Sequence, residues 1–275
     1  MATEVYFGTV GLFQWIPAPA INMPTGQQGY EQRFDYLNGA ADVAQSKAAH
    51  REYEMSWSMQ ANMNIDMIVA YKSGVYGPPP YYYLDPAAMA HNVAPMASWA
   101  HAALACYDGP NLAGIGATRP TVATTASNTQ AYPIESALYT LTGTETVRKL
   151  LIPIPSGYTL YLGAHGTQTG TARVSYKPAG GSVTALTLLG HNVTTLTNAT
   201  VSGVAYAEVY LTGAGTLTLS SLIAQILPTG SAAPTGKWRT GRGTWGLKFD
   251  GPIEDVLYSA ALDRRNVSCK MIEVW

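Results

Sequence analysis

The sequence has little charge. Only 12% of its 275 residues are charged, 16 Lys and Arg against 17 Asp and Glu, and the formal net charge is -1. Clustered Lys and Arg supply most of the affinity for nucleic acids, so this balance and the lack of a basic stripe argue against DNA or RNA as a partner. Intrinsic disorder is also excluded, because a chain with 47% hydrophobic residues buries enough apolar surface to offset the entropy lost on folding.

Cysteines and long apolar runs are scarce as well. Cys106 and Cys269 belong to no C-x-x-C motif, so we predict two free, buried thiols and no disulfide bond. No apolar run approaches the roughly 20 residues of a membrane span, and the first residues, MATEVYFGTV, lack the basic and apolar regions of a signal peptide. We therefore expect no membrane insertion, and folding in the cytoplasm of the producing cell.

What the sequence does have is the composition of a turn-rich β protein, with abundant Gly, Thr, Ala and Tyr. Its charged residues are unevenly distributed, because residues 121–236 contain only seven of them. These seven are Glu135, Glu145, Arg148, Lys149, Arg173, Lys177 and Glu208. We therefore predict a mainly β chain in which a discontinuous flanking domain, residues 1–118 and 237–275, surrounds an inserted domain of residues 119–236.

The inserted domain is predicted to be a β-sandwich of jelly-roll type, because short strands alternate with Gly and Pro turn signals. Residues 149–164 contain two strands separated by a Pro-Ser-Gly turn, and residues 172–190 contain two more around residues 177–181. Residues 204–227 supply a further pair, which we predict to turn at the Gly-Ala-Gly of residues 213–215.

The flanking domain is also predicted to be mostly β. Residues 51–60 alternate large apolar residues with Glu and Ser, which indicates a half-buried strand. Asn38 and Gly39 predict a tight hairpin turn, because a type I′ turn requires positive φ at both central residues. Asp85 is a candidate helix N-cap, and Pro86 suits the first helical position.

GRGTWG, residues 241–246, has the G-x-G-x-x-G spacing of dinucleotide-binding loops. Such a loop follows a strand and opens a helix whose N-terminus binds the pyrophosphate. Here it follows a Pro-, Gly- and Ser-rich segment, and Trp245, Leu247 and Phe249 alternate after its start as they would in a strand. We therefore interpret the glycines as a flexible entry into a strand and predict no cofactor.

No catalytic or metal-binding constellation is visible. The five histidines show neither H-x-x-x-H nor H-E-x-x-H spacing, and no G-x-S-x-G motif occurs. We predict that the protein is not an enzyme, and the sequence nominates no catalytic, metal-binding or ligand-binding residue. A glycosidase-like carboxylate pair stays open, because its two acids can come from any strands. A second alternative is a lectin-like, sugar-binding surface of aromatic rings in the inserted domain. Its candidate residues are Tyr158, Tyr161, Tyr176, Tyr206 and Tyr210.

Four segments carry a family resemblance. They are residues 5–23 (VYFGTVGLFQWIPAPAINM), 37–57 (LNGAADVAQSKAAHREYEMSW), 84–100 (LDPAAMAHNVAPMASWA) and 257–275 (LYSAALDRRNVSCKMIEVW). In style and order they resemble minor tail proteins of long-tailed bacteriophages that infect actinobacteria, and they are similar in plan to distal tail, or baseplate hub, proteins. The resemblance implies a split-barrel-like flanking domain that packs with its copies into a ring, with the inserted sandwich projecting outward. The inserted domain resembles, more loosely, the galectin-like or carbohydrate-binding sandwiches that such proteins carry.

The function that this resemblance implies is structural. A ring at the tail tip, for which six copies is one candidate number, would connect the tail tube to the adsorption apparatus. The implied partners are the tail tube, the tail hub and receptor-binding proteins, and the implied location is the virion, after synthesis in the bacterial host. The alternative is a carbohydrate-binding module that recognises a host cell-surface glycan through the inserted sandwich.

Overall fold

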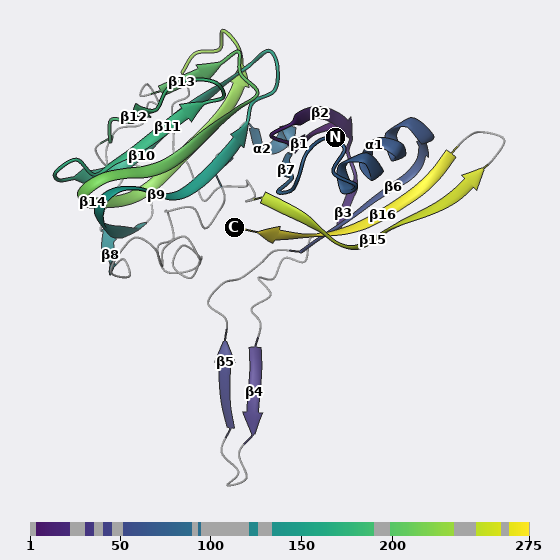
Figure 1. Cartoon of the computed structure of the whole chain (residues 1–275), viewed down its shortest axis with the longest axis horizontal. Helices are drawn as coiled ribbons and strands as arrows, with labels where there is room; N and C mark the ends of the chain where they lie inside the picture. Colours follow the sequence, from purple (N-terminus) through teal and green to yellow (C-terminus); the bar gives the residue numbers. More distant parts are fainter. Residues whose placement is uncertain are drawn as a thin grey trace.

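The computed structural model of the protein describes residues 4–22, 31–35, 41–45, 52–89, 93–94, 121–125, 134–189, 199–233, 246–259 and 264–274. This part of the chain is mainly β, which confirms the predicted fold class, and its strands form four antiparallel sheets (Figure 1). Strands before residue 90 and after residue 245 pair with one another and not with the strands between them. The predicted domain boundaries themselves lie outside the described residues.

Two sheets enclose the core of the flanking domain. The first, here called the junction sheet, has the order β2-β1-β7, with β1 at Glu4–Thr9, β2 at Leu12–Pro17 and β7 at Tyr82–Leu84. The second, here called the outer sheet, has the order β15-β16-β6-β3, with β15 at Gly246–Ser259, β16 at Arg264–Val274, β6 at Glu52–Ala61 and β3 at Ala20–Asn22. Tyr81 and Leu247 exchange two backbone hydrogen bonds, of 2.8 and 2.6 Å, that link the sheets. The two sheets thus surround one core and remain open, in a split-barrel-like arrangement.

Strand β6 shows how this core is specified by alternation. Tyr53, Met55 and Trp57 are 1%, 2% and 4% exposed, whereas the Glu and Ser residues between and after them face solvent. Successive side chains of a strand point to opposite faces, so the apolar set enters the core and the polar set lines the outside. The half-buried strand predicted for residues 51–60 is therefore confirmed.

Helix α1 (Asn62–Lys72) covers the same core and is not apparent from the sequence. Its buried residues, Ile65, Ile68 and Tyr71, form a narrow stripe at a spacing of three. The exposed side carries apolar residues as well, since Met63 is 78% and Val69 42% exposed, although Asp66 is also exposed. Because apolar residues occur on both sides, the contrast that identifies an amphipathic helix in a sequence is weak.

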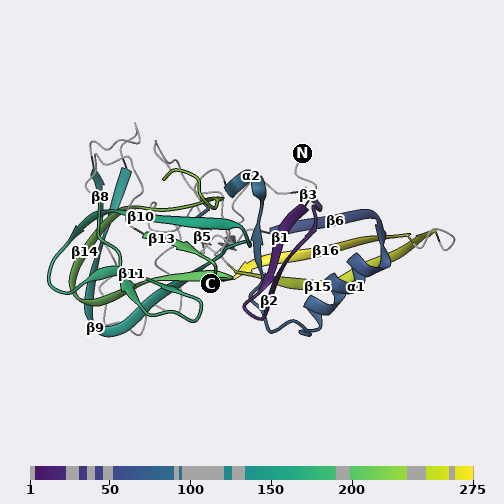
Figure 2. The same ribbon diagram turned by 90° about the horizontal axis from the view of Figure 1, so that it is seen from above.

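The described strands of the inserted domain form one antiparallel sheet. They are β8 (Thr121–Thr125), β9 (Ile134–Pro153), β10 (Tyr158–Gln168), β11 (Arg173–Pro178), β12 (Thr184–Ala185), β13 (Ala199–Ser202) and β14 (Tyr206–Pro228). The predicted Pro-Ser-Gly turn joins β9 to β10, and β11 and β12 are the second predicted pair. The long strands β9 and β14 curve, and their buried side chains pack into one core (Figure 2).

The turn predicted at residues 213–215 is wrong, because β14 passes through them as one strand of 23 residues. Gly213 and Gly215 have φ values of 86° and 127°, so the chain bends there without reversing. The backbone N–H groups of Thr171 and Thr169 donate 2.8 Å hydrogen bonds to carbonyl oxygens on either side of Gly215. A Cβ on either glycine would overlap this neighbouring backbone. The glycines therefore let β10 and β11 follow one another closely along the same strand.

The junction sheet is buried on both faces. Phe7 of β1 enters the flanking core, while its neighbour Tyr6 enters the core of the inserted domain. From β2, the ring of Phe13 contacts that of Tyr206 in β14, with centroids 6.2 Å apart. Burial at this junction raises the pKa of the Tyr82 hydroxyl on β7 to about 12. Figure 2 shows β1 and β2 between the inserted sheet and the strands of the outer sheet.

Two small elements complete the described chain. Strands β4 (Glu31–Asp35) and β5 (Ala41–Gln45) pair only with each other among the described strands and stand apart from the rest in Figure 1. The predicted turn residues Asn38 and Gly39 fall between them, outside the described residues. Helix α2 begins at Pro86, directly after Asp85, and ends at Met89, which is buried in the core of the inserted domain.

Gly213→Ala is expected to destabilise the protein more than Gly203→Ala. Both glycines have positive φ, 86° and 71°, and alanine in this region is strained by about 1–2 kcal/mol. At Gly213 the added methyl group also overlaps the carbonyl of Thr171, which adds about 1–3 kcal/mol. No described atom lies within 4 Å of a Cβ at Gly203. Urea titration gives the free energy of unfolding, and equal losses in the two variants would contradict the close crossing.

Candidate functional site

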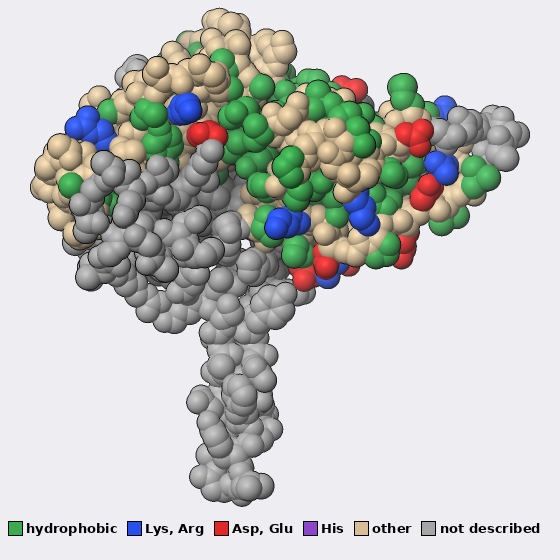
Figure 3. Space-filling model, viewed as in Figure 1, with side chains coloured by type: hydrophobic (Ala, Val, Ile, Leu, Met, Phe, Trp, Pro, Cys, Tyr) green, Lys and Arg blue, Asp and Glu red, His purple; other side chains and the backbone are tan. Residues whose placement is uncertain are grey.

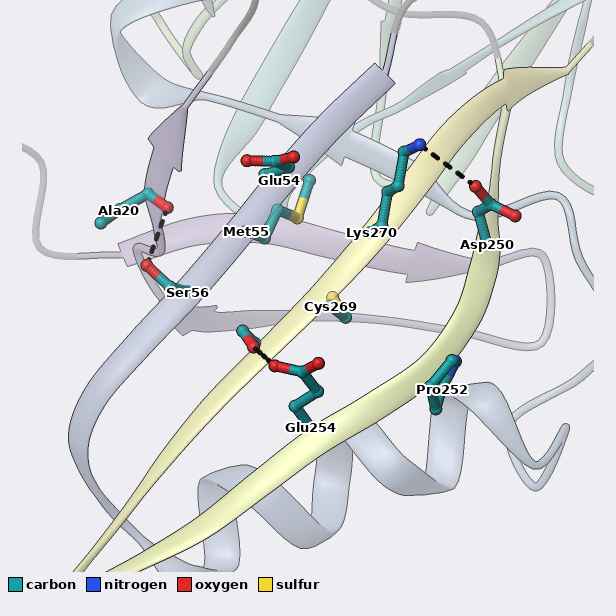
Figure 4. A pocket seen from close by; sticks show the side chains of 10 residues that line it. Ala20, Glu54, Met55, Ser56, Asp250, Pro252, Glu254, Cys269 and Lys270 are labelled. Carbon is teal, nitrogen blue, oxygen red and sulfur yellow. Dashed lines mark hydrogen bonds and ion pairs between the residues drawn. The ribbon is translucent and has the colours of Figure 1, made fainter.

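A groove of about 560 Å³ lies on the solvent-facing side of the outer sheet (Figure 4). Glu54 lines it from β6, Asp250 and Glu254 from β15, and Lys270 from β16. The residues adjacent to Glu54 and Lys270 in the chain are buried, so strand alternation alone places the charged side chains on the outer face. Pro252 adds an apolar part to the wall.

An irregularity in β15 shapes this groove. The ladder between β15 and β16 shifts register between Asp250 and Glu254, and Gly251 has a φ of 84°. The ammonium group of Lys72, at the end of α1, donates a 2.6 Å hydrogen bond to the carbonyl oxygen of Gly251. A bulge of this kind bends the strand that contains it. It separates the two carboxylates along the groove, with Pro252 between them in Figure 4.

The groove carries a net negative charge. The Lys270 ammonium lies 2.9 Å from a carboxylate oxygen of Glu52 and 3.5 Å from one of Asp250. The hydrogen bond with Glu52 is the main cause that raises the pKa of Lys270. Glu54 makes no ion pair with any residue that the structure describes. The three lining carboxylates, those of Glu54, Asp250 and Glu254, outnumber the one ammonium by two charges.

This arrangement can bind a cationic group. Ser268 donates a 3.1 Å hydrogen bond from its hydroxyl to Glu254, which fixes one carboxylate at the rim. Within the described ranges, no group of three His, Cys, Asp or Glu side chains could hold a metal ion. Cys269 is free and buried, as predicted, and burial raises its pKa to about 12. Cys106 lies outside the described residues.

Exposed apolar side chains gather on the flanking domain. Seven large hydrophobic residues are exposed in the described part of the chain: Val10, Met63, Val69, Val75, Val183, Val256 and Leu257. All except Val183 belong to the flanking domain, and Met63 and Val69 lie on α1. Thr9 donates a 2.7 Å hydrogen bond to the carbonyl of Tyr76, which holds the loop after α1 beside the turn between β1 and β2.

Charged side chains, like the exposed apolar ones, are more frequent on the flanking domain. On the face drawn in Figure 3, few charged side chains lie over the inserted domain and more lie over the flanking domain. Arg265 of β16 lies 3.1 Å from Asp255 and 3.8 Å from Asp66 of α1, so an ion-pair network connects the helix to the outer sheet. Both charged and exposed apolar side chains therefore concentrate on the domain that contains the groove.

The glycine motif contributes nothing to this site. Of GRGTWG, only Gly246 is described, as the first residue of β15. Leu247 is buried and Lys248 is exposed, so the strand predicted after the glycines is confirmed. A dinucleotide loop needs a helix at this point. Asp85 and Pro86 do not line the groove either.

None of the five tyrosines that suggest a lectin-like surface is exposed. Tyr161 and Tyr210 are each 6% exposed, and the other three are half-buried. Tyr158 and Tyr206 have ring contacts with Trp15 and Phe13 of the junction sheet. Two of the three half-buried rings are thus engaged in packing between the domains.

Of the charged residues that line the groove, the sequence alone places only Glu54 on an exposed strand face. The alternation in residues 51–60 places Glu54 on the exposed face of its strand, whereas the alignment of Asp250 and Glu254 with it depends on how three distant segments pair.

No protein-family model and no curated protein matches the chain. None of the described helices has the length and apolar character needed to cross a membrane.

Cys269 is expected to resist alkylation in the folded protein. Burial raises its pKa from 9.0 to about 12, so almost no thiolate is present at pH 8, and the reaction with iodoacetamide should be about a hundredfold slower or more than in denaturant. The pKa of the thiol is higher in the folded state than in the unfolded state. Ionisation of Cys269 is therefore expected to lower the free energy of unfolding as pH rises from 9 to about 12. Mass spectrometry of the Cys269 peptide measures the rate. Similar rates with and without denaturant would contradict the burial of the thiol.

Proposed function

We propose that the protein is a structural component of a bacteriophage tail tip, a distal or minor tail protein that associates with its own copies through the flanking domain. In this role a ring of copies connects the tail tube to the adsorption apparatus. The tail hub and the receptor-binding proteins are its further neighbours in the virion. The resemblance of the four sequence segments to such proteins supports the assignment.

The distribution of exposed apolar residues carries the proposal. Six of the seven described ones belong to the flanking domain, although the inserted domain is of comparable size. Exposed apolar side chains are a common feature of surfaces that bind a partner, because water solvates them poorly. Their concentration on the flanking domain supports that domain as the part that associates with its copies.

The β4–β5 hairpin is a second support. A two-stranded sheet alone is at best marginally stable in water, and its outer edges expose unpaired backbone groups. No other described strand pairs with β4 or β5, and in Figure 1 the hairpin stands apart from the other sheets of both domains. Such an arm suits a protein that completes its hydrogen bonding on a neighbouring subunit.

We expect the inserted domain to project from the proposed ring. It is fixed to one side of the junction sheet by the contacts of Tyr6 and Phe13, while the outer sheet lies on the other side of that sheet. Association through the outer sheet and α1 leaves the inserted domain free of those contacts. Glycan recognition by its tyrosines has less support, because none of the five is exposed.

Purified protein at micromolar concentration is expected to form closed rings with outward knobs in negative-stain images. Met63→Asp should weaken association tenfold or more, since burying a methionine contributes about 1.5–3 kcal/mol. Val183→Asp, on the inserted domain, should leave association unchanged and serves as the matched control. Sedimentation velocity quantifies both variants. Single chains at every concentration, or equal effects of the two substitutions, would contradict the proposal.

A further inference from the structure

Strand β2 is an outer strand of the junction sheet. Among the described strands only β1 pairs with it, in a ladder that has no register shift. The stretch from Leu12 to Ile16 contains neither a charged residue nor a proline. Charges, prolines and bulges are the features that keep the edge strands of natural proteins from pairing with other chains. The free edge of β2 lacks all three over this stretch.

The backbone groups on this edge can be assigned from the turn that precedes it. A turn of two residues joins β1 to β2, so the flanking pair, Thr9 and Leu12, is hydrogen-bonded between the strands. Because hydrogen-bonded and non-hydrogen-bonded pairs alternate, the N–H and C=O groups of Phe13 and Trp15 point away from β1. Within the described part of the chain these four groups form no hydrogen bond. They are therefore available to an added strand.

The position of this edge favours a slender partner. At its far end the indole N–H of Trp57 already donates a 2.9 Å hydrogen bond to the carbonyl oxygen of Pro17. In Figure 1 β2 lies at the upper border of the junction sheet, and the inserted sheet extends above it on one side. A single strand or a hairpin can reach Phe13 and Trp15 in this position, whereas a whole domain would meet the inserted domain first.

The chain itself has a slender segment with free edges, the β4–β5 hairpin. Its strands pair only with each other among the described strands, and in Figure 1 the hairpin lies below the other sheets, whereas β2 lies at the top. We propose that the hairpin of one copy adds its strand β5 to the free edge of β2 in the next copy. This contact rests on the self-association proposed above and names the surface that the hairpin joins.

Strand β5 suits this edge better than β4. Three of the five residues of β4 are charged, whereas Asp42 is the one charged residue among the five of β5. Charged residues on an edge oppose the addition of a strand, and the other residues of β5 bring no charge next to the rings of Phe13 and Trp15. In strand addition the main-chain hydrogen bonds supply the affinity, here through the four open groups of β2.

Such a contact is heterologous, because the two surfaces that meet are different. Each copy gives its hairpin to one neighbour and receives the hairpin of another on β2. Head-to-tail contacts of this kind generate a closed ring when their rotation closes. Strand addition would thus connect the junction sheet, which both cores share, to the next copy in the proposed ring.

Hydrogen exchange with single-residue resolution tests the contact. In the associated wild-type protein, exchange of the Phe13 and Trp15 amides is expected to be about tenfold slower, or more, than in protein diluted to single chains, because these N–H groups become hydrogen-bonded. The amide of Gln14 is the internal control. It is bonded to Phe7 within each chain, so its exchange should change little.

Two lysine substitutions in the hairpin form a matched pair, because Ala44 of β5 and Gln32 of β4 are partners in its ladder. A44K places a charge on the strand that joins β2, so it should weaken association about tenfold or more. Q32K places the same charge one strand further from β2 and should associate within about threefold of the wild type. Sedimentation velocity measures both variants.

The outcomes separate this contact from the association itself. Unchanged exchange of Phe13 and Trp15 on association, or equal effects of A44K and Q32K, would show that the contact is wrong, while the association of the wild type stands. Slow exchange of both amides already in single chains would mean that the edge is covered within its own chain, which also contradicts the contact. A wild-type protein that stays a single chain at every concentration contradicts the proposed association, and with it the strand addition.

Discussion

Burial of the junction sheet on both faces is the constraint on which the rest of the structure depends. Phe7, 3% exposed, belongs to one core, and the adjacent Tyr6, 7% exposed, belongs to the other. Each square ångström of apolar surface removed from water contributes about 25 cal/mol, so both cores draw stability from the same three strands. The sheet is a shared wall, and neither domain is complete without it.

This shared wall decides which surfaces remain for partners. The inserted domain covers one side of the flanking domain, so the outer sheet and α1 stay open to neighbours. These are also the parts where exposed Met63, Val69, Val256 and Leu257 lie, together with the acidic groove. Only 12% of the residues are charged, so a charged groove close to exposed apolar side chains is an unusual surface for this chain. Such a surface is suited to binding a partner. The architecture and the surface chemistry therefore both favour the flanking domain as the part that we propose to associate with other copies.

Much of the fold could be predicted where one physical cause dominates. Alternation alone identifies β6, because Tyr53 and Met55 enter a core while their neighbours meet solvent. Helix α1 could not be found, since Met63 on its outer side is as apolar as Ile65 on its inner side. The glycines at 213 and 215 predict a reversing turn, because a sequence does not show that Thr169 and Thr171, in the turn between β10 and β11, lie against them.

The candidate site could be predicted only in part, for a related reason. Glu54 is on an exposed strand face in any β interpretation of its segment. Its position beside Asp250 and Lys270 requires that β6, β16 and β15 lie next to one another, although they come from opposite ends of the chain. Sequence alone does not show that the tyrosines of the inserted domain are not exposed, because rings such as Tyr206 pack against another domain.

Scanning calorimetry of the wild-type protein tests the shared wall most directly. If both cores depend on the junction sheet, the flanking and inserted domains unfold together in one cooperative transition, with equal calorimetric and van't Hoff enthalpies. Two resolved transitions would show that each domain keeps its fold when the other is lost. That result would contradict the shared wall and the rigid placement of the inserted domain on it.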